Sequence, residues 1–202
     1  MPLTINLKSA VLAVSDALDL VGVNDFQHGK RVAMIARETA VLMGLPAARL
    51  DNLVFACLLH DLGVSSTTEH CRLISGAEYH DCQAHCERAF QLLQPFAHLS
   101  LLATAIRYHH TPWAELPADI SEADAIDSNL ILLADRVDAL LLRHGLENPL
   151  FHAAGICREI STLAGPVLRP EIVAAFLAAA AREAFWIALV PRHVQSYLAD
   201  LA

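Results

Sequence analysis

The stretch Leu58-Leu59-His60-Asp61-Leu62-Gly63 places an imidazole beside a carboxylate at the end of an apolar run. Residues 53–59 are all apolar, which predicts a buried helix, and Gly63 is typical of a residue that stops one. Neighbouring side chains inside a helix point about 100° apart and cannot easily share one ligand. At a helix end this constraint relaxes, so the His60-Asp61 pair is a candidate metal-binding corner. Its weight depends on the rest of the chain.

Apolar residues recur at spacings of three and four along most of the chain, which predicts helices and no strands. Asn24 or Asp25 can cap the second helix, and Pro46 suits the first turn of the third. The expected helices cover residues 7–20, 24–43, 46–60, 80–93, 98–110, 124–143, 151–163 and 170–188, with a last segment after Pro191. We predict a single all-α domain of roughly seven to nine helices over residues 1–190. Residues 191–202 form either a terminal helix that closes the core or the start of a linker.

Composition excludes several classes of protein. Hydrophobic residues make up 55% of the 202 residues and charged residues 18%, which supplies a core and argues against disorder. The net charge of -8 offers no basic surface to duplex DNA or RNA, or to an anionic membrane. The first residues lack a signal-peptide pattern, and no run of about 18 uncharged apolar residues occurs. Five cysteines without a Cys-x-x-Cys pair predict reduced thiols, so we expect a cytoplasmic protein.

Histidines gather at the ends of the expected helices. His28 lies in the first turn of the second helix, His85 lies early in the fourth, and His109 and His110 end the fifth. Asp135 sits inside the apolar run 130–137, where an unpaired carboxylate would be costly. Together with the opening pair, these residues match a two-metal site, in which one carboxylate bridges cations about 3.5–4 Å apart. Mixed nitrogen and oxygen ligands suit iron, manganese or zinc and disfavour calcium or magnesium.

This series of residues resembles the HD metal-dependent phosphohydrolase superfamily, and most closely its HD-GYP branch, whose members hydrolyse cyclic dinucleotides. The likeness covers about half of the chain, and each single motif in it is weak, but five motifs in the family's order are a specific signal. The motifs are His28-Gly-Lys-Arg-Val-Ala, the opening stretch, His85-Cys-Glu-Arg-Ala-Phe, Tyr108-His109-His110 and Leu133-Ala134-Asp135-Arg136-Val137.

The resemblance implies an HD-type helical domain that holds two divalent transition metals, iron or manganese in preference to zinc. It implies a nucleotide or cyclic dinucleotide as substrate, and a homodimer or a further signalling domain as partner. Asp61 would bridge the two ions and position the hydroxide that attacks phosphorus. Asp138 would be a supporting acceptor. The implied ligands are His28, His60, Asp61 and Asp135 for one metal, and Asp61, His85, His109 and His110 for the other.

The chain departs from the family pattern beside the metal corner. The family usually continues with Gly-Lys, whose lysine lies near the substrate phosphate, whereas Val64 follows Gly63 here. The Gly-Tyr-Pro loop is absent, and Asn129 stands where an arginine is expected. Two hypotheses therefore stay open: a phosphodiesterase, and a degenerate module that binds metal or nucleotide as a sensor or docking domain without turnover. A nucleotide phosphohydrolase on the same ligands is a third.

Three further residues carry less specific signals. Trp113 is a candidate for stacking on a substrate base, with a plain loop anchor as the alternative. Arg143 is a candidate phosphate-binding residue. Cys86, next to His85, is interpreted as a packed thiol, with metal binding or oxidation as the alternative.

Overall fold

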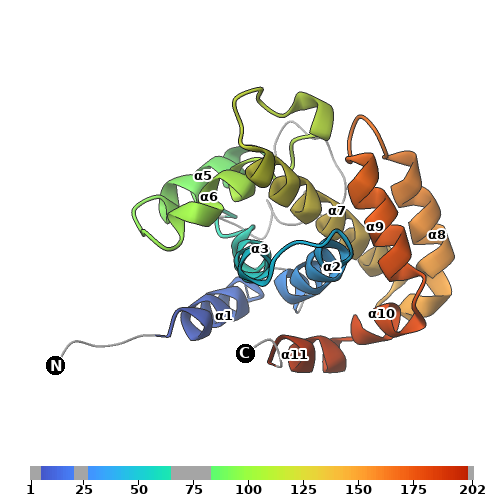
Figure 1. Ribbon diagram of the computed structural model, residues 1–202. Helices are drawn as coiled ribbons and strands as arrows, with labels where there is room; N and C mark the ends of the chain where they lie inside the picture. Colours follow the sequence, from blue (N-terminus) through green and yellow to red (C-terminus); the bar gives the residue numbers. More distant parts are fainter. Residues whose placement is uncertain (1–5, 21–26, 65–82, 200–202) are drawn as a thin grey trace.

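The computed structural model describes residues 6–20, 27–64 and 83–199 (Figure 1). Within these ranges the chain forms ten α-helices, one short 3-10 helix and no strand, which confirms the all-α prediction. The helices are α1 (Leu7–Leu18), α2 (His28–Leu42), α3 (Ala47–Leu59), α5 (Gln83–Leu93), α6 (Ser100–Arg107), η2 (Trp113–Glu115), α7 (Glu122–His144), α8 (Pro149–Thr162), α9 (Pro170–Ala180), α10 (Glu183–Ala188) and α11 (Pro191–Ala199).

Helices α2 and α7 form the centre of the fold. Every residue from Gly29 to Ala36 in α2 is buried, and α7 buries an unbroken run from Ser128 to Ala134. Helix α2 packs against α3, α7, α9 and α11, while the α5–α6 hairpin lies on one side and α8 with α9 on the other (Figure 1). Because both central helices are apolar on most faces, a polar side chain that they carry inward has no solvent to satisfy it.

The start of α2 positions His28. The helix begins at His28 itself, after Gln27 in a left-handed conformation with φ of 69°. The Gln27 N–H donates to Asp19 Oδ2 at 3.0 Å, which ties this start to the end of α1. The predicted caps Asn24 and Asp25 lie outside the described residues.

The predicted helix over residues 170–188 is wrong in one respect, because it divides into α9 and α10. Arg182 is extended, with φ of -91° and ψ of 121°, and serves as the N-cap of α10. The break turns the ring of Trp186 inward, where its Nε1–H donates to the Ala180 carbonyl at 2.7 Å. This division accounts for ten helices where seven to nine were expected. The apolar pattern continues through the break, so periodicity gave no signal of it.

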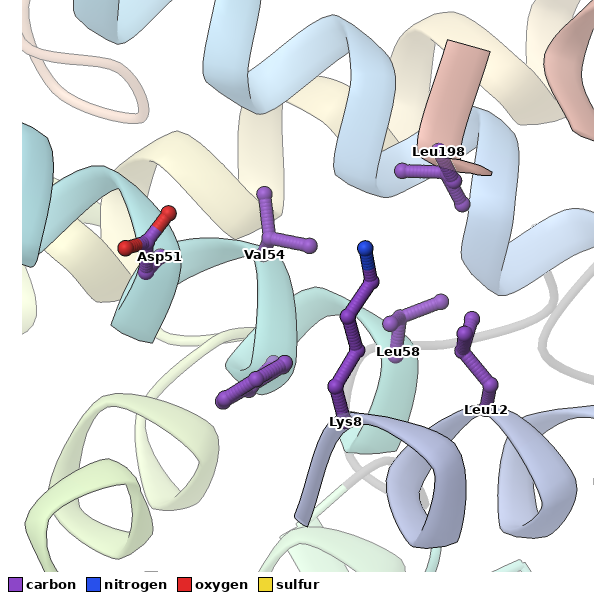
Figure 2. A pocket seen from close by; sticks show the side chains of 7 residues that line it. Lys8, Leu12, Asp51, Val54, Leu58 and Leu198 are labelled. Atoms are coloured by element: carbon purple, nitrogen blue, oxygen red, sulfur yellow. The ribbon is translucent and has the colours of Figure 1, made fainter. Parts of the chain in front are cut away.

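The last segment packs on the core as helix α11. Val194 and Leu198 are buried against the rest of the fold, and the Tyr197 hydroxyl donates to Glu38 Oε1 at 2.7 Å. Leu198 also lines a small apolar pocket of about 190 Å³ between α1, α3 and α11, with Lys8 at its side (Figure 2). The division at residue 190 stays a prediction. No helix within the described ranges has the length and apolar character needed to cross a bilayer.

Candidate metal centre

Five helices bring the predicted ligands to one place. His28 is the first residue of α2, His60 and Asp61 follow the last residue of α3, and His85 lies in the first turn of α5. The other three are His109 and His110, just beyond α6, and Asp135 in the middle of α7. Each of the first six lies at or near a helix end, where a side chain can turn toward its neighbours without disturbing a helical ladder.

The first group of side chains surrounds His28 Nε2. This atom lies 3.2 Å from His60 Nε2, 3.7 Å from Asp61 Oδ2 and 3.4 Å from Asp135 Oδ1. His60 Nε2 is also 3.4 Å from Asp61 Oδ2. Two ligand atoms about 2.1 Å from one ion are separated by about 3.0–3.4 Å in octahedral or tetrahedral geometry. The observed separations are close to that range, and one ligand atom from each of His28, His60 and Asp61 lies within 4.8 Å of the others. These three side chains are therefore spaced as ligands of one cation, and Asp135 adjoins them at His28.

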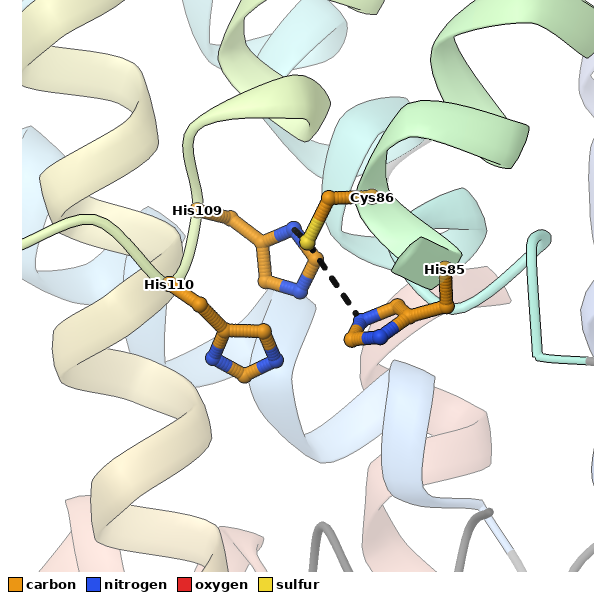
Figure 3. A group of neighbouring side chains, drawn as sticks. All are labelled: His85, Cys86, His109 and His110. Atoms are coloured by element: carbon orange, nitrogen blue, oxygen red, sulfur yellow. Dashed lines mark hydrogen bonds between the residues drawn. The ribbon is translucent and has the colours of Figure 1, made fainter. Parts of the chain in front are cut away.

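The second group consists of His85, His109 and His110, with ring centroids 4.1–5.3 Å apart (Figure 3). His85 and His109 are completely buried, and His110 is nearly so. His85 Nε2 lies 3.5 Å from Asp61 Oδ1. Asp61 therefore presents one oxygen to each group: Oδ2 faces His28 and His60, and Oδ1 faces His85. This is the arrangement required of a carboxylate that bridges two cations.

Hydrogen bonds fix the orientation of three imidazole rings. His28 Nδ1 lies 2.8 Å from Asp138 Oδ2, and His60 Nδ1 lies 2.7 Å from the Cys57 carbonyl. His109 Nδ1 lies 2.6 Å from the Ile106 carbonyl. Since carboxylates and carbonyls only accept, each Nδ1 is the donor, which leaves each Nε2 to face the cluster.

The supporting layer extends to a guanidinium that sequence reasoning missed. Arg31 donates to both oxygens of Asp138, from Nε at 2.5 Å and from Nη2 at 2.9 Å, and both side chains are fully buried. Asp138 therefore joins Arg31 to His28. The signal in the sequence was the spacing: Arg31 lies three residues after His28, and Asp138 three residues after Asp135, so each shares a helix face with a ligand.

Electrostatics keep Asp61, His109 and His110 in the protonation states that metals require, whereas burial raises the pKa of Asp135. Burial raises the pKa of Asp61, but His60, His85, His28 and His110 outweigh it and hold that pKa well below its usual value. Burial, followed by the neighbouring imidazoles, lowers the pKa of both His109 and His110 well below 6.5. These two rings are therefore neutral at pH 7.

Two buried features test whether the residues fit a metal. His109 Nε2 is buried and has no hydrogen-bond partner among the described residues. The Nε2 atoms of His28 and His60 lie 3.2 Å apart while each Nδ1 bonds elsewhere, an arrangement that either a shared proton or a metal cation between the two nitrogens satisfies. Nitrogen and carboxylate donors of this kind suit a divalent transition metal. Asp61 and Asp135 keep 16% and 18% of their side chains exposed, so the site opens to solvent at its carboxylates.

The two predicted substrate-binding residues make contacts with residues outside the cluster. Trp113 N–H donates to the Val167 carbonyl at 2.9 Å, and the Arg169 guanidinium lies 5.0 Å from the centre of the Trp113 ring. These contacts favour the alternative of a loop anchor. Arg143 lies eight residues beyond Asp135, about 12 Å along α7, and its exposed guanidinium is 3.9 Å from Glu159.

Gly63 has a different role from the predicted helix stop. Helix α3 ends at Leu59, and the backbone of α5 at His85 passes so close to Gly63 that a β-carbon there would overlap its carbonyl oxygen. Arg88 Nε donates to the Gly63 carbonyl at 2.7 Å and holds the same contact. The glycine therefore sets the distance between the His60-Asp61 corner and His85. No sequence pattern indicated this contact.

Comparison with known proteins places these motifs in a family. A model described as HD domain matches residues 25–140. The chain is 35% identical over 198 residues to the 3'3'-cGAMP-specific phosphodiesterase 1 of Vibrio cholerae, a match that covers 95% of this chain and 46% of that protein. It is 30% identical over 162 residues to the cyclic di-GMP phosphodiesterase of Thermotoga maritima, covering 75% of this chain and 43% of that protein.

The fold also has a solved counterpart. A crystal structure of a cyclic GMP-AMP-specific phosphodiesterase from V. cholerae superposes with a TM-score of 0.76 over 96% of this chain and 53% of that one. At 19% sequence identity this likeness concerns the fold alone. The chain spans about half the length of the curated relatives it matches.

Proposed function

The chain belongs to the HD domain family, and on that premise we propose that it is a metal-dependent phosphodiesterase that hydrolyses a cyclic dinucleotide. The observation that carries the proposal is the position of Asp61, which has one carboxylate oxygen near His28 and His60 and the other near His85. A carboxylate shared between two imidazole groups is the central element of dinuclear hydrolytic sites.

The proposed centre holds two divalent transition metals. His28, His60, Asp61 and Asp135 would hold one, and Asp61 with the three buried histidines 85, 109 and 110 would hold the other. When bound, such ions lower the pKa of water and neutralise charge on a phosphodiester. Neutral imidazoles and an ionised Asp61 at pH 7 would accept the metals without displacing protons from those groups.

The chain's own residues supply orientation and access. Asp138 and the Cys57 and Ile106 carbonyls fix ring tautomers, so the donor atoms need little reorganisation when metal binds. The partly exposed carboxylates 61 and 135 define the open side, and a phosphodiester would approach the centre there. Because the net charge of the chain is -8, the metals would supply the local positive charge that an anionic substrate needs.

The substrate class rests on the relatives. The two matched curated proteins are named for 3'3'-cGAMP and cyclic di-GMP, which are both cyclic dinucleotides. We propose that the present chain also acts on a cyclic dinucleotide, and we do not specify which two bases it carries. The roles of Trp113 in stacking on a base and of Arg143 in phosphate binding stay predictions.

A second candidate is a degenerate module that binds metal or nucleotide as a sensor or docking domain without turnover. The specific observation in its favour is Val64, whose partly buried side chain follows the metal corner where the family usually has a lysine. Asn129 adds to it, because this residue stands at the position of an expected arginine and its side chain is engaged in hydrogen bonds to residues 167 and 169.

The deciding experiment measures metal content and turnover on the same protein. The chain is purified anaerobically, loaded with iron or manganese, and assayed with 3'3'-cGAMP, cyclic di-GMP, a linear dinucleotide and bis(p-nitrophenyl) phosphate. We expect two metals per chain and turnover that is lost in Asp61→Ala. The matched control is His152→Ala, because His152 of α8 stacks against His144 of α7. We expect this variant to retain both the two metals and the turnover. Two metals without turnover would favour the sensor, and less than one metal per chain would refute both.

A further inference from the structure

We propose that the sulfur of Cys86 is a ligand of the metal position formed by His85, His109 and His110. The inference rests on the proposed metal centre and goes beyond it. It adds sulfur to the nitrogen donors and the shared Asp61 oxygen of this position, whereas the position around His28 has only nitrogen and oxygen donors. The two positions would then differ in which metal they prefer.

The distances around Cys86 fit a shared cation. Cys86 Sγ lies 3.5 Å from His85 Nε2, the same nitrogen that faces Asp61 Oδ1 (Figure 3). For an ion with metal–nitrogen bonds of about 2.05 Å and metal–sulfur bonds of about 2.3 Å, the nitrogen and sulfur are about 3.1 Å apart at a bond angle of about 90° and about 3.6 Å apart at the tetrahedral angle. One ligand atom from each of Cys86, His85, His109 and His110 lies within 4.8 Å of the others. The thiol is therefore already at the separation that ligation requires.

A second, independent observation comes from His109. This side chain is fully buried, its Nδ1 bonds to the Ile106 carbonyl, and its Nε2 has no partner among the described residues. Figure 3 shows this nitrogen turned toward the space between His85 and His110, with the Cys86 thiol at the edge of the same space. A buried polar atom without a partner is unfavourable, so the unpartnered His109 Nε2 points to a ligand at this position.

The other described cysteines lack this setting. Cys57 is buried in the apolar core and Cys157 is partly buried on α8, and neither is among the residues grouped with histidines. Cys86 is adjacent in sequence to His85, and the first turn of α5 brings both side chains inward. Its thiol also lies 3.6 Å from His109 Nδ1. The alternative, a thiol that donates a weak hydrogen bond to His85 Nε2, fits the same distance.

A thiolate ligand would change metal preference at this position alone. Thiolate is a soft donor, which favours zinc, cobalt(II) or iron over manganese and magnesium. The position around His28, with carboxylates 61 and 135, remains suited to harder ions. The centre would thus take two different metals from a mixed supply, with the softer ion beside Cys86.

Cobalt(II) gives a readout that does not depend on activity. Apoprotein is titrated with cobalt(II) under anaerobic conditions while near-ultraviolet absorption is recorded, because thiolate ligands add an intense charge-transfer band that imidazole and carboxylate ligands do not. We expect the band in the wild type and in Cys157→Ser, and its loss in Cys86→Ser with both ions still bound. Helix content by circular dichroism checks that each variant is folded.

The outcomes separate this inference from the proposed function. Two cobalt ions per chain without the band in the wild type would overturn sulfur ligation and leave the metal centre intact. A band that survives Cys86→Ser would assign it to another thiol and would equally overturn the inference. No cobalt binding would refute both proposals. If Cys86→Ser fails to fold, X-ray absorption at the zinc edge of the wild type decides, because sulfur in the inner coordination sphere is required.

Discussion

The buried pair of Arg31 and Asp138 gives the sharpest prediction, because it links the stability of the core to the orientation of a metal ligand. Asp138 accepts three hydrogen bonds, two from Arg31 and one from His28 Nδ1. Burial raises the pKa of Asp138, but Arg31 and His28 together outweigh it and lower that pKa to about 2, so the carboxylate is ionised at neutral pH. The substitution Asp138→Asn removes its charge and leaves its shape nearly unchanged.

The magnitude follows from the contacts. An asparagine has one acceptor oxygen in place of two, so its NH₂ group must face at least one N–H donor of Arg31 or His28. The buried guanidinium loses its counter-charge, which costs about 3–5 kcal/mol of unfolding free energy. His28 loses a charged acceptor, and loss of such a supporting carboxylate typically lowers metal affinity by about 10- to 100-fold.

The assay combines two measurements on three variants. Urea unfolding of metal-free protein gives stability, and competition with a chromophoric chelator gives metal affinity. The double variant Arg31→Met/Asp138→Asn removes the guanidinium together with the negative charge of Asp138, so we expect it to regain most of the stability but not the affinity. Asp127→Asn is the matched control on the same helix. Its carboxylate also pairs with an arginine, Arg49 at 2.9 Å, but this pair is partly exposed and remote from the histidines. We expect a loss of about 1 kcal/mol or less there, with affinity unchanged.

Two results would refute this reasoning. If the double variant regained metal affinity together with stability, Asp138 would act on the metal only through folding and not through His28. If Asp138→Asn were as stable as the wild type, the buried Arg31 guanidinium would not need the Asp138 carboxylate as its counter-charge.

Three further predictions concern the same site. Metal-free protein loses stability as pH falls from 7 to 5, because His109 and His110 have folded pKa values below 6.5 and the unfolded chain takes up protons first; urea midpoints that stay constant over this range would contradict it. Gly63→Ala lowers the free energy of unfolding measured in urea by about 1–3 kcal/mol and weakens metal binding, since the added β-carbon overlaps the backbone of α5. Gly155→Ala, in an open part of α8, is its control and is neutral or stabilising. Val64→Lys raises phosphodiester turnover about tenfold, equal to about 1.4 kcal/mol of transition-state stabilisation, with metal content unchanged; equal rates would show that the missing lysine does not limit catalysis.

Much of the site could be predicted because its residues break a local pattern. A carboxylate such as Asp135 stands where the apolar pattern of its helix predicts an apolar residue, and a histidine pair follows the end of another helix. Polar residues that depart from the local pattern in this way often mark functional sites. The all-α fold follows from the periodicity of the apolar residues and is confirmed. The residues predicted as metal ligands lie close together, and their role as ligands stays a prediction. The HD family inferred from the motif series is confirmed by the matching family model.

The features that escaped prediction depend on contacts between distant segments. Arg31 looked like an ordinary helix residue, and only the packing of α2 on α7 brings it to Asp138, 107 positions away. The close approach of α5 to Gly63 likewise depends on how two helices meet, which no local pattern contains. The break before Arg182 is hidden because alanine-rich sequence on both sides favours helix.

The metal ligands and the substrate-binding positions are constrained differently in this fold, and Asn129 shows why. Asn129 is fully buried in α7, where its Nδ2 donates to the Val167 carbonyl at 3.0 Å and its Oδ1 accepts from the Arg169 N–H at 2.8 Å. An arginine there would have to displace the segment that precedes α9, so the expected phosphate-binding side chain cannot return by one substitution. Val64 is only partly buried and lies next to the metal corner, so a lysine fits there without such a rearrangement. If phosphodiester turnover depends on one restored cation, it will be recovered at position 64 and not at position 129.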